Sequence, residues 1–248
     1  MIQIIGVIPA RYASTRFPAK PLADIGGKSM VQRVYEQAKK SSALSHVIVA
    51  TDHAKIYDHV ISFGGDACMT SENHGSGTDR CFEVLSRQPK KFDYLINVQG
   101  DEPFIAPGQI DRLASLLDGQ TELATLVKKI EDPEQLLNPN TVKVISNKNN
   151  EAIYFSRSTI PYLRNVPQEE WLKHLIFFKH IGMYAYRADV LQAITRLPVS
   201  SLEKAESLEQ LRWIENGFKI KVAETPVETI SVDTPDDILK ALAYLKSN

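Results

Sequence analysis

The chain has 248 residues, of which 43% are hydrophobic and 24% are charged, and its 29 Lys and Arg nearly balance its 30 Asp and Glu to a net charge of −1. This balance argues against a protein that binds the nucleic-acid backbone, because such binding needs a surplus of positive charge. No stretch approaches the ~20 apolar residues of a membrane span, and the two cysteines lack metal-binding spacing, so we expect a cytoplasmic protein without a membrane partner.

The first half of the sequence alternates short apolar runs with amphipathic stretches. Apolar runs rich in β-branched residues are typical of strands that are covered on both faces, and the stretches between them have helical periodicity. This order, with short connections, predicts a mostly parallel sheet with right-handed crossovers. The predicted strands are residues 2–8, 46–51, 66–69, 94–98 and 123–127, and the predicted helices are 30–40, 54–63, 78–87 and 107–117.

The second half is less regular. Asn-Lys-Asn-Asn at 147–150 predicts a hairpin turn between two short strands. Thr234 and Pro235 are good N-cap and first-turn residues for a final helix. No Gly- or Ser-rich linker separates the halves, so we expect a single α/β domain with a mixed extension. The other predicted strands are residues 142–146, 152–155, 177–186 and 219–222, and the other predicted helices are 188–196, 202–216 and 234–246.

The loop after the first predicted strand, residues 9–22, carries three cations, Arg11, Arg16 and Lys20. It leaves the carboxyl end of a central strand, where open α/β sheets bind ligands. Guanidinium and ammonium groups both pair with phosphate oxygens. We therefore interpret the loop as a phosphate-binding loop, with a solvated basic loop as the alternative. Two other glycine-containing segments lack the spacing of a Walker loop or a dinucleotide fingerprint.

Two aspartates stand where a metal ligand is expected. Asp101 follows Gly100 just past the predicted strand 94–98, and Asp233 precedes the final helix. A carboxylate at a strand end suits a hard cation that bridges phosphates. For Asp233, a capping role at the helix start is the alternative. The basic loop and the two aspartates together indicate a site for a nucleoside triphosphate and Mg²⁺.

The segment from Ile8 to Leu22, Ile-Pro-Ala-Arg-Tyr-Ala-Ser-Thr-Arg-Phe-Pro-Ala-Lys-Pro-Leu, resembles the signature loop of the sugar-acid cytidylyltransferases. Within them the resemblance is closest to the family that acts on 3-deoxy-manno-octulosonate (Kdo). Phe17 and Ala19 stand where family members often carry Leu and Gly, which leaves the charged positions intact. Further blocks of likeness are residues 50–53, 74–80, 97–103, 138–144, 154–161, 180–184, 208–212 and 232–236.

The resemblance implies a Rossmann-like nucleotidyltransferase sheet with a mixed α/β extension for sugar binding and dimerisation. The single domain would comprise a CTP-binding part (1–130), the extension (about 131–225), and a return strand with the C-terminal helix (226–248). The implied reaction transfers CMP from CTP to the anomeric hydroxyl of Kdo and releases pyrophosphate. CMP-Kdo would serve lipopolysaccharide synthesis, and the protein would be a homodimer.

The resemblance also implies roles for individual residues. Lys20, Arg11, Asp101 and Asp233 would be catalytic, with Asp101 and Asp233 as ligands of Mg²⁺. The CTP site would comprise Ala10, Arg11, Ser14, Arg16, Lys20, Ser76, Gly77, Thr78 and Arg80. The sugar acid would contact Gln99, Arg157, Arg164, His180, Tyr184, Glu209 and Gln210, with Arg157 as the first choice for its carboxylate.

Several alternatives stay open at this point. Arg157 and Arg164 could be surface charges, Glu209 could face solvent, and His180 could be a core histidine. The nearest rival function is a cytidylyltransferase for another sugar acid such as an N-acylneuraminate, and segments 155–161 and 180–184 favour Kdo. A catalytically silent nucleotide-binding module on the same fold is a second rival, because fold does not fix function. The presence of Lys20, Asp101 and Asp233 argues against it.

Overall fold

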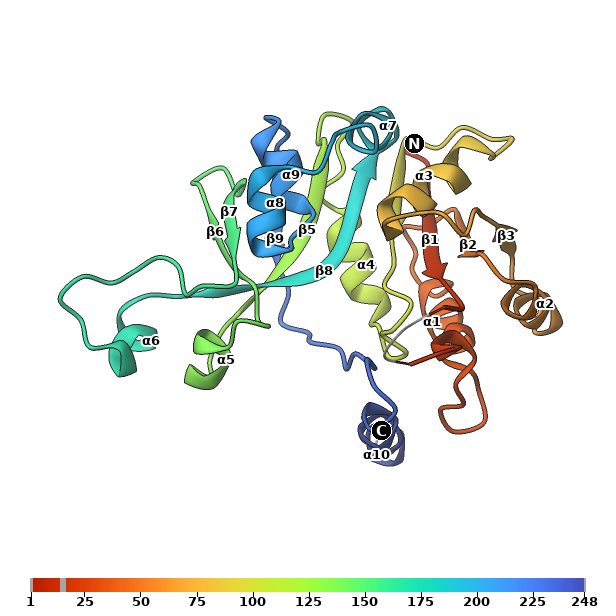
Figure 1. The fold of residues 1–248 in the computed structure, drawn as a ribbon, viewed down its shortest axis with the longest axis horizontal. Helices are drawn as coiled ribbons and strands as arrows, with labels where there is room; N and C mark the ends of the chain where they lie inside the picture. Colours follow the sequence, from red (N-terminus) through yellow and green to blue (C-terminus); the bar gives the residue numbers. More distant parts are fainter. Residues whose placement is uncertain (1, 14–16, 248) are drawn as a thin grey trace. The chain divides into compact units, whose positions relative to one another are not determined.

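A computed structural model describes residues 2–13 and 17–247 of the chain. The chain divides into two compact units. The first unit comprises Met1–Ala114 and Thr229–Asn248, and the second comprises Ser115–Glu228 (Figure 1). β5, which the expected CTP-binding part (1–130) includes, belongs to the second unit.

The first unit contains a parallel sheet with the strand order β3-β2-β1-β4 (Figure 1). Its strands are β1 (Ile4–Ala10), β2 (His46–Thr51), β3 (Ala67–Met69) and β4 (Tyr94–Asn97). Ile5, Val7 and Ile8 are fully buried, which explains why β1 is a continuous apolar run and not an alternating one. The predicted mostly parallel sheet is confirmed.

Helices follow each strand of this sheet, as predicted. They are α1 (Met30–Ala38), α2 (Ala54–Ser62), α3 (Gly77–Ser86) and α4 (Pro107–Ala114), and a short 3₁₀ helix, η1 (Lys20–Leu22), lies in the loop after β1. The chain moves outward from β1 to β2 and β3, and then returns to the other side of β1 to form β4. Right-handed crossovers therefore place α3 on the face opposite α1 and α2. The reversal of the strand order also creates a topological switch point between β1 and β4. Open α/β sheets bind ligands at the carboxyl ends of the strands at such a point.

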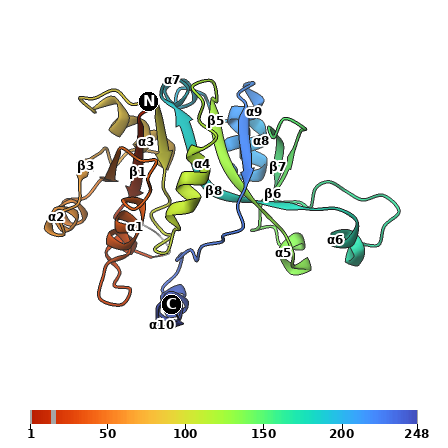
Figure 2. The same ribbon diagram turned by 180° about the vertical axis from the view of Figure 1, so that it is seen from behind.

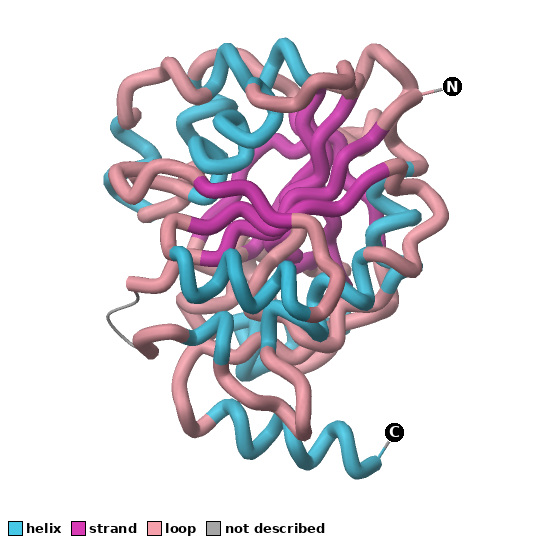
Figure 3. Tube along the Cα trace, turned by 90° about the vertical axis from the view of Figure 1, so that its right-hand side faces the viewer, coloured by secondary structure: helices cyan, strands magenta, loops and turns pink. Residues whose placement is uncertain are grey.

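The C-terminal segment returns to the first unit. Val232 and Ala241 are buried in one apolar cluster with Ile25 and Met30, and α10 (Asp237–Ser247) ends at the C mark in Figure 3. The expected return strand is wrong: the described segment between β9 and α10 has no strand and is an extended connection, in which the N–H of Val232 donates to the carbonyl of Asp101 at 2.9 Å.

The start of the final helix also differs from the prediction. α10 begins at Asp237, so Thr234 and Pro235 lie in the turn before the helix and not at its first positions. The carboxylate of Asp237 instead accepts from the N–H groups of Asp233 and Thr234, at 3.2 and 3.0 Å, and from the Thr234 hydroxyl at 2.9 Å. These bonds fold residues 233–237 into a turn and fix the backbone of Asp233.

The second unit contains a mixed sheet, in agreement with the expected extension. β5 (Leu123–Lys129) pairs antiparallel with β8 (Phe178–Arg187) and parallel with β9 (Ile220–Glu224), as Figure 2 shows. β6 (Lys143–Ser146) and β7 (Ala152–Ser156) form the predicted hairpin. The helical segments are α5 (Pro133–Leu137), η2 (Gln168–Glu170), α6 (Trp171–His174), α7 (Ala188–Ile194), α8 (Ser201–Glu206) and α9 (Gln210–Glu215).

The predicted helix 202–216 is wrong as a single element. It is divided into α8 and α9 at Ser207, whose φ of 52° is left-handed and ends the first helix. Leu208, which follows, and Leu211 are both buried. Among the described residues, no helix is long and apolar enough to cross a membrane.

Candidate active site

A cleft of about 350 Å³ lies at the carboxyl ends of β1 and β4 in the first unit. This volume falls within the range of roughly 300–1,000 Å³ that is typical of small-molecule sites. The walls come from the loop after β1, from η1, from the start of α3, from the loop after β4, and from the segment before α10. The lining residues are Pro9, Ala10, Arg11, Lys20, Pro21, His74, Gly75, Ser76, Gly77, Arg80, Asn97, Gln99, Gly100, Asp101 and Asp233.

Lys20 lies between two carboxylates in this cleft. Its Nζ is 3.0 Å from Asp101 Oδ2 and 3.6 Å from Asp233 Oδ1. The three side chains are only partly exposed, at 17%, 30% and 40%, so their charges are incompletely screened by water. The ammonium group offsets the repulsion between the two carboxylates and holds them in one place.

Gly100 allows the two strand-end loops to meet. A Cβ atom at Gly100 would lie 2.5 Å from the carbonyl oxygen of Pro9, which is closer than non-bonded atoms approach. A residue without a side chain is therefore required immediately before Asp101. The close approach brings the loop after β4 against the loop after β1.

Glu102 links the same loop to the C-terminal segment. The Thr229 hydroxyl donates to Glu102 Oε2 at 2.5 Å. Burial raises the pKa of Glu102 to about 7; the bond from Thr229 opposes this rise, and the charge of Asp101 adds to it. Together with the backbone bond from Val232 to Asp101, this contact positions the segment that carries Asp233.

The start of α3 forms another wall of the cleft. Ser76 is its N-cap: the Ser76 Oγ accepts from the Asp79 N–H at 3.1 Å and donates to Asp79 Oδ2 at 3.0 Å. The unpaired N–H groups of a first helical turn favour bound anions. Gly77 lines the cleft, whereas Thr78 is 3% exposed and is not among the lining residues.

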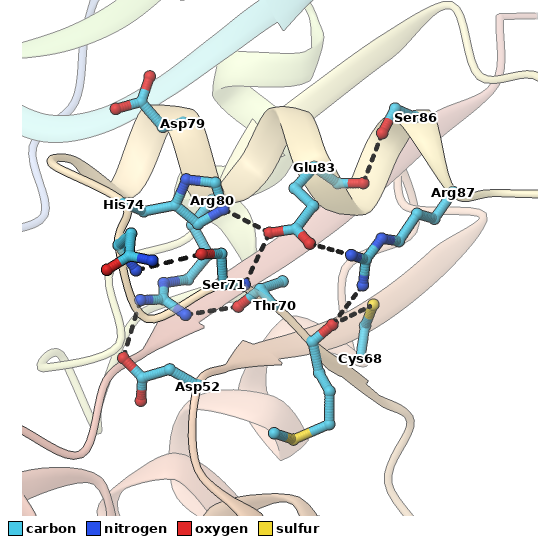
Figure 4. Close-up of polar contacts among 12 residues, drawn as sticks. Asp52, Cys68, Thr70, Ser71, His74, Asp79, Arg80, Glu83, Ser86 and Arg87 are labelled. Atoms are coloured by element: carbon cyan, nitrogen blue, oxygen red, sulfur yellow. Dashed lines mark hydrogen bonds and ion pairs between the residues drawn. The ribbon is translucent and has the colours of Figure 1, made fainter.

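Arg80 lines the cleft but is engaged in a buried ion pair (Figure 4). Its Nη2 lies 2.9 Å from Asp52 Oδ2, and its Nη1 donates to the Thr70 hydroxyl. Asp52 also accepts from the N–H of Tyr12 at 3.0 Å. Asp52 thus connects the loop after β1 to α3 through Arg80, so Arg80 helps to shape the cleft.

Glu83 holds the segment that precedes α3 (Figure 4). Its carboxylate accepts from the Ser71 N–H at 2.9 Å, contacts His74 Nε2, and forms an ion pair with Arg87. Burial raises the pKa of Glu83, but the bonds from Ser71 and His74 and the charge of Arg87 outweigh it and bring the pKa below its ordinary value. Glu83 therefore orients His74 and the wall residues after it.

The structure brings most of the expected CTP-site residues together. Ser14 and Arg16 lie outside the described residues. Asp52, Glu83 and Asn97 were missed by sequence reasoning; Asn97 is 7% exposed at the end of β4 and lines the cleft. Asp52, His74 and Asn97 stand inside the family blocks given above, and that was the available signal. The expected residues that line the cleft are Ala10, Arg11, Lys20, Ser76, Gly77, Arg80, Asp101 and Asp233.

The expected sugar-acid residues fall into two groups. Gln99 lines the cleft of the first unit. The others, Arg157, Arg164, His180, Tyr184, Glu209 and Gln210, belong to the second unit.

An aromatic cluster in the second unit contains two of these residues. The Tyr184 ring centroid lies 5.1 Å from those of His180 and Trp213, and Gln210 precedes Trp213 by one turn of α9. Among the described side chains, Tyr184 OH, Gln210 Nε2 and Trp213 Nε1 are buried polar atoms without a hydrogen-bond partner. Each such atom lowers the free energy of unfolding by about 1–3 kcal/mol. A polar ligand that pairs with these atoms would recover this free energy.

The charged members of the second group differ in environment. The Arg157 guanidinium donates to the carbonyls of Glu206, Pro139 and Ser207, at 2.6, 3.2 and 3.4 Å. Arg164 is exposed, and Glu209 is half-buried at the start of α9. Burial lowers the pKa of His180 to about 3, so this ring is neutral at physiological pH and cannot supply positive charge to a carboxylate.

Comparison of the sequence with known proteins identifies the family to which the chain belongs. The family model described as "Cytidylyltransferase" matches residues 5–221. The 3-deoxy-manno-octulosonate cytidylyltransferase of Cytophaga hutchinsonii is 58% identical over 240 residues, which cover 96% of each chain. The enzyme of the same name from Parabacteroides distasonis is 57% identical over 250 residues, which cover 99% of each chain.

Solved structures give the same result. CMP:2-keto-3-deoxy-manno-octonic acid synthetase complexed with CTP has a TM-score of 0.92 and 44% identity, over 99% of each chain. A 4-diphosphocytidyl-2C-methyl-D-erythritol synthase from Anaerococcus prevotii has a TM-score of 0.64 at 15% identity, which indicates a shared fold alone. The chain therefore belongs to the cytidylyltransferase family, in its 3-deoxy-manno-octulosonate cytidylyltransferase branch.

Proposed function

We propose that the chain transfers CMP from CTP to the anomeric hydroxyl of Kdo and releases pyrophosphate. The observation that carries the proposal is the position of Lys20 between Asp101 and Asp233, in a cleft at the switch point of the sheet. A triphosphate with a divalent cation needs this combination of mobile positive charge and oxygen ligands. The names of the relatives and the CTP bound to the solved relative support the choice of nucleotide and acceptor.

The residues of the first unit would act mainly by positioning and by stabilising charge. Arg11 and Lys20 would contact the triphosphate, and Ser14 and Arg16 are expected to join them. The start of α3 and Ala10 would line the nucleoside. Attack by the sugar hydroxyl on the α-phosphorus adds negative charge to its oxygens while pyrophosphate leaves. Cations already held in place stabilise that charge without reorganising during the reaction.

Asp101 and Asp233 would hold Mg²⁺. The described residues contain no group of three or more His, Cys, Asp or Glu side chains that could hold a metal ion. This fits Mg²⁺, which is commonly bound through one or two carboxylates together with substrate phosphates and water. When bound, Mg²⁺ offsets charge on the α-phosphate and lowers the pKa of the attacking hydroxyl.

The second unit would bind the sugar acid. Its unpartnered buried groups, Tyr184 OH and Gln210 Nε2, are suited to the hydroxyls of a sugar. Arg157 stays the first candidate for the carboxylate, because its three bonds use three of five N–H donors and restrain the guanidinium. Arg164 and Glu209 complete the proposed acceptor residues of the second unit, and Gln99 stays a predicted sugar-acid residue of the first unit.

The proposal includes a cytoplasmic homodimer formed through the second unit. Exposed apolar side chains of that unit support it: Ile176 and Ile153 are 57% and 51% exposed. Side chains of this kind are often covered at subunit interfaces.

Pyrophosphate release tests the proposed reaction. The protein with Mg²⁺ should release pyrophosphate from CTP and Kdo, and should not do so with N-acetylneuraminate or with ATP, GTP or UTP. Release with CTP and neuraminate would be consistent with the proposed mechanism but would contradict the proposal that Kdo is the acceptor. Binding of CTP without release from any pair would support the silent nucleotide-binding module.

Substitution of Glu83 by Gln tests how the cleft wall is held. We expect the KM for CTP to rise about tenfold with little change in kcat, because a misplaced wall weakens ground-state and transition-state binding alike. The pKa of Glu83 is lowered in the fold, so its contribution to stability is present above its ordinary pKa and is lost as pH falls through the folded value. Thermal unfolding should therefore depend less on acidic pH in the variant than in the wild type.

The matched control for this prediction is Glu72→Gln, which removes the same charge from an exposed neighbour. Equal KM values for CTP in Glu83→Gln and Glu72→Gln would contradict the assigned role of Glu83.

A further inference from the structure

The pairing of β5 and β8 contains an irregularity at the acceptor side of the proposed reaction. Regular antiparallel pairing runs from Lys129 opposite Phe178 to Leu126 opposite Ile181. The next pair is Thr125 opposite Tyr184, so one step along β5 corresponds to three steps along β8. Gly182 and Met183 are the additional residues, and they form a bulge in β8.

The bulge brings two expected sugar-acid residues into contact. Four residues of a regular strand span about 13 Å, yet the ring centroids of His180 and Tyr184 are 5.1 Å apart. Directly paired residues share a face of a sheet, so both rings lie on the face of their partners, Val127 and Thr125. The pair of rings therefore depends on the bulge.

The Thr125 hydroxyl is at the centre of the bulge. Thr125 is fully buried, and its Oγ1 donates toward Met183 O at 2.8 Å and Ile181 O at 3.0 Å. The Ile181 carbonyl directly precedes the bulge, and the Met183 carbonyl belongs to it. The same Oγ1 lies 3.1 Å from His180 Nε2.

This geometry favours one position for the hydrogen of a neutral His180 ring. A hydroxyl has one hydrogen to donate, and a carbonyl oxygen can only accept. If the Thr125 hydrogen points to the carbonyls, the contact with His180 is a bond only when Nε2–H donates to Oγ1. In the reverse arrangement Oγ1 would donate to Nε2. It would then face the carbonyl oxygens of Met183 and Ile181, at 2.8 and 3.0 Å, without a hydrogen between them, and the lone pairs would repel. A neutral ring with its hydrogen on Nε2 has a bare Nδ1 that accepts.

We propose that Thr125 is a positioning residue of the acceptor site: its hydroxyl holds the β8 bulge and fixes His180 as the Nε2–H tautomer, so that Nδ1 accepts from a hydroxyl of the sugar acid. The inference rests on the proposed function, in which His180 contacts the acceptor. Packing already restrains the plane of the ring, which lies edge-on to Phe155 at 5.3 Å and 83°. The tautomer is the property that Thr125 adds.

The tautomer is read directly by ¹⁵N NMR of protein labelled at histidine, and the His180→Gln variant identifies the His180 signals. The wild type should show Nε2–H, and the signal should change in Thr125→Val, which keeps the shape of the side chain and removes the hydroxyl. Thr125→Ser keeps the hydroxyl and should retain the wild-type pattern. A wild-type spectrum with Nδ1–H overturns the inference, and this result does not require the Val variant to fold.

Kinetics test the link to the acceptor. Thr125→Val should raise the KM for Kdo at least tenfold, leave the KM for CTP within twofold, and be rescued by Thr125→Ser. Thr195→Val is the matched control, since its hydroxyl donates to the Gln192 carbonyl elsewhere in the second unit. A change of tautomer without a change in the KM for Kdo overturns the positioning role. Absence of turnover with Kdo in the wild type overturns the proposed function, whereas the NMR result still decides the contact between Thr125 and His180.

Discussion

Asp101→Asn should lower the rate of pyrophosphate release by roughly 1,000-fold, on the scale of losing a preorganised group that stabilises charge in the transition state. In the wild type, Lys20 Nζ lies 3.0 Å from Asp101 Oδ2. The amide has the shape of the carboxylate, so its oxygen can still accept from Lys20 Nζ, and the fold should persist. The lost negative charge weakens the bond to Mg²⁺. A titration with Mg²⁺ at saturating CTP and Kdo should therefore show a higher concentration at half-maximal rate.

The matched control for this variant is Asp236→Asn, which removes the same charge from an exposed position near Asp233. This control should retain wild-type activity at every Mg²⁺ concentration. If Asp101→Asn kept more than about a tenth of the wild-type rate at limiting Mg²⁺, the metal assignment would be wrong. A circular dichroism spectrum and a melting curve establish that the variant is folded.

Lys20→Met should have two effects of opposite sign. Turnover should fall roughly 100- to 1,000-fold, because Lys20 is the mobile cation expected to stabilise the triphosphate as charge develops. Affinity for a divalent cation without nucleotide should rise, because the ammonium group no longer lies between Asp101 and Asp233 at 3.0 and 3.6 Å. Binding of Mn²⁺, followed by electron paramagnetic resonance in the absence of CTP, measures the second effect.

A fall in turnover together with a rise in metal affinity distinguishes this role of Lys20 from a general folding defect. A misfolded variant would lose both turnover and metal affinity. Lys28→Met is the control, since it removes a lysine whose partner, Glu36, lies outside the cleft. Unchanged kcat together with unchanged Mn²⁺ affinity in Lys20→Met would remove Lys20 from the site.

Local patterns predicted the regular elements well. The strand predicted at residues 46–51 coincides with β2, because a strand that is buried on both faces leaves a continuous apolar run. The division of the predicted helix 202–216 was missed, since Ser207 carries no sequence signal for a left-handed conformation. The short helices α5 and α6 were missed as well, because four or five residues are too few for a helical period to be recognised.

The charged residues of the cleft were also accessible from the sequence. Arg11, Lys20 and Asp101 stand in contiguous segments whose chemistry matches a triphosphate and a metal ion. Their supporting partners were not accessible. Arg80 meets Asp52 across 28 positions of the chain, and Thr125 meets His180 across 55. A single sequence contains no record of such contacts.

By itself, the sequence determined the α/β class, the family and the charged residues of the nucleotide site, because periodicity and family blocks are properties of neighbouring residues. Only the tertiary structure decided that Lys20 lies between Asp101 and Asp233, that Glu83 and Asp52 hold the cleft walls, and that a bulge joins His180 to Tyr184. These contacts depend on how strands end and pair in space. Hydrogen-bond geometry between distant segments is set by packing, and packing is absent from any local pattern.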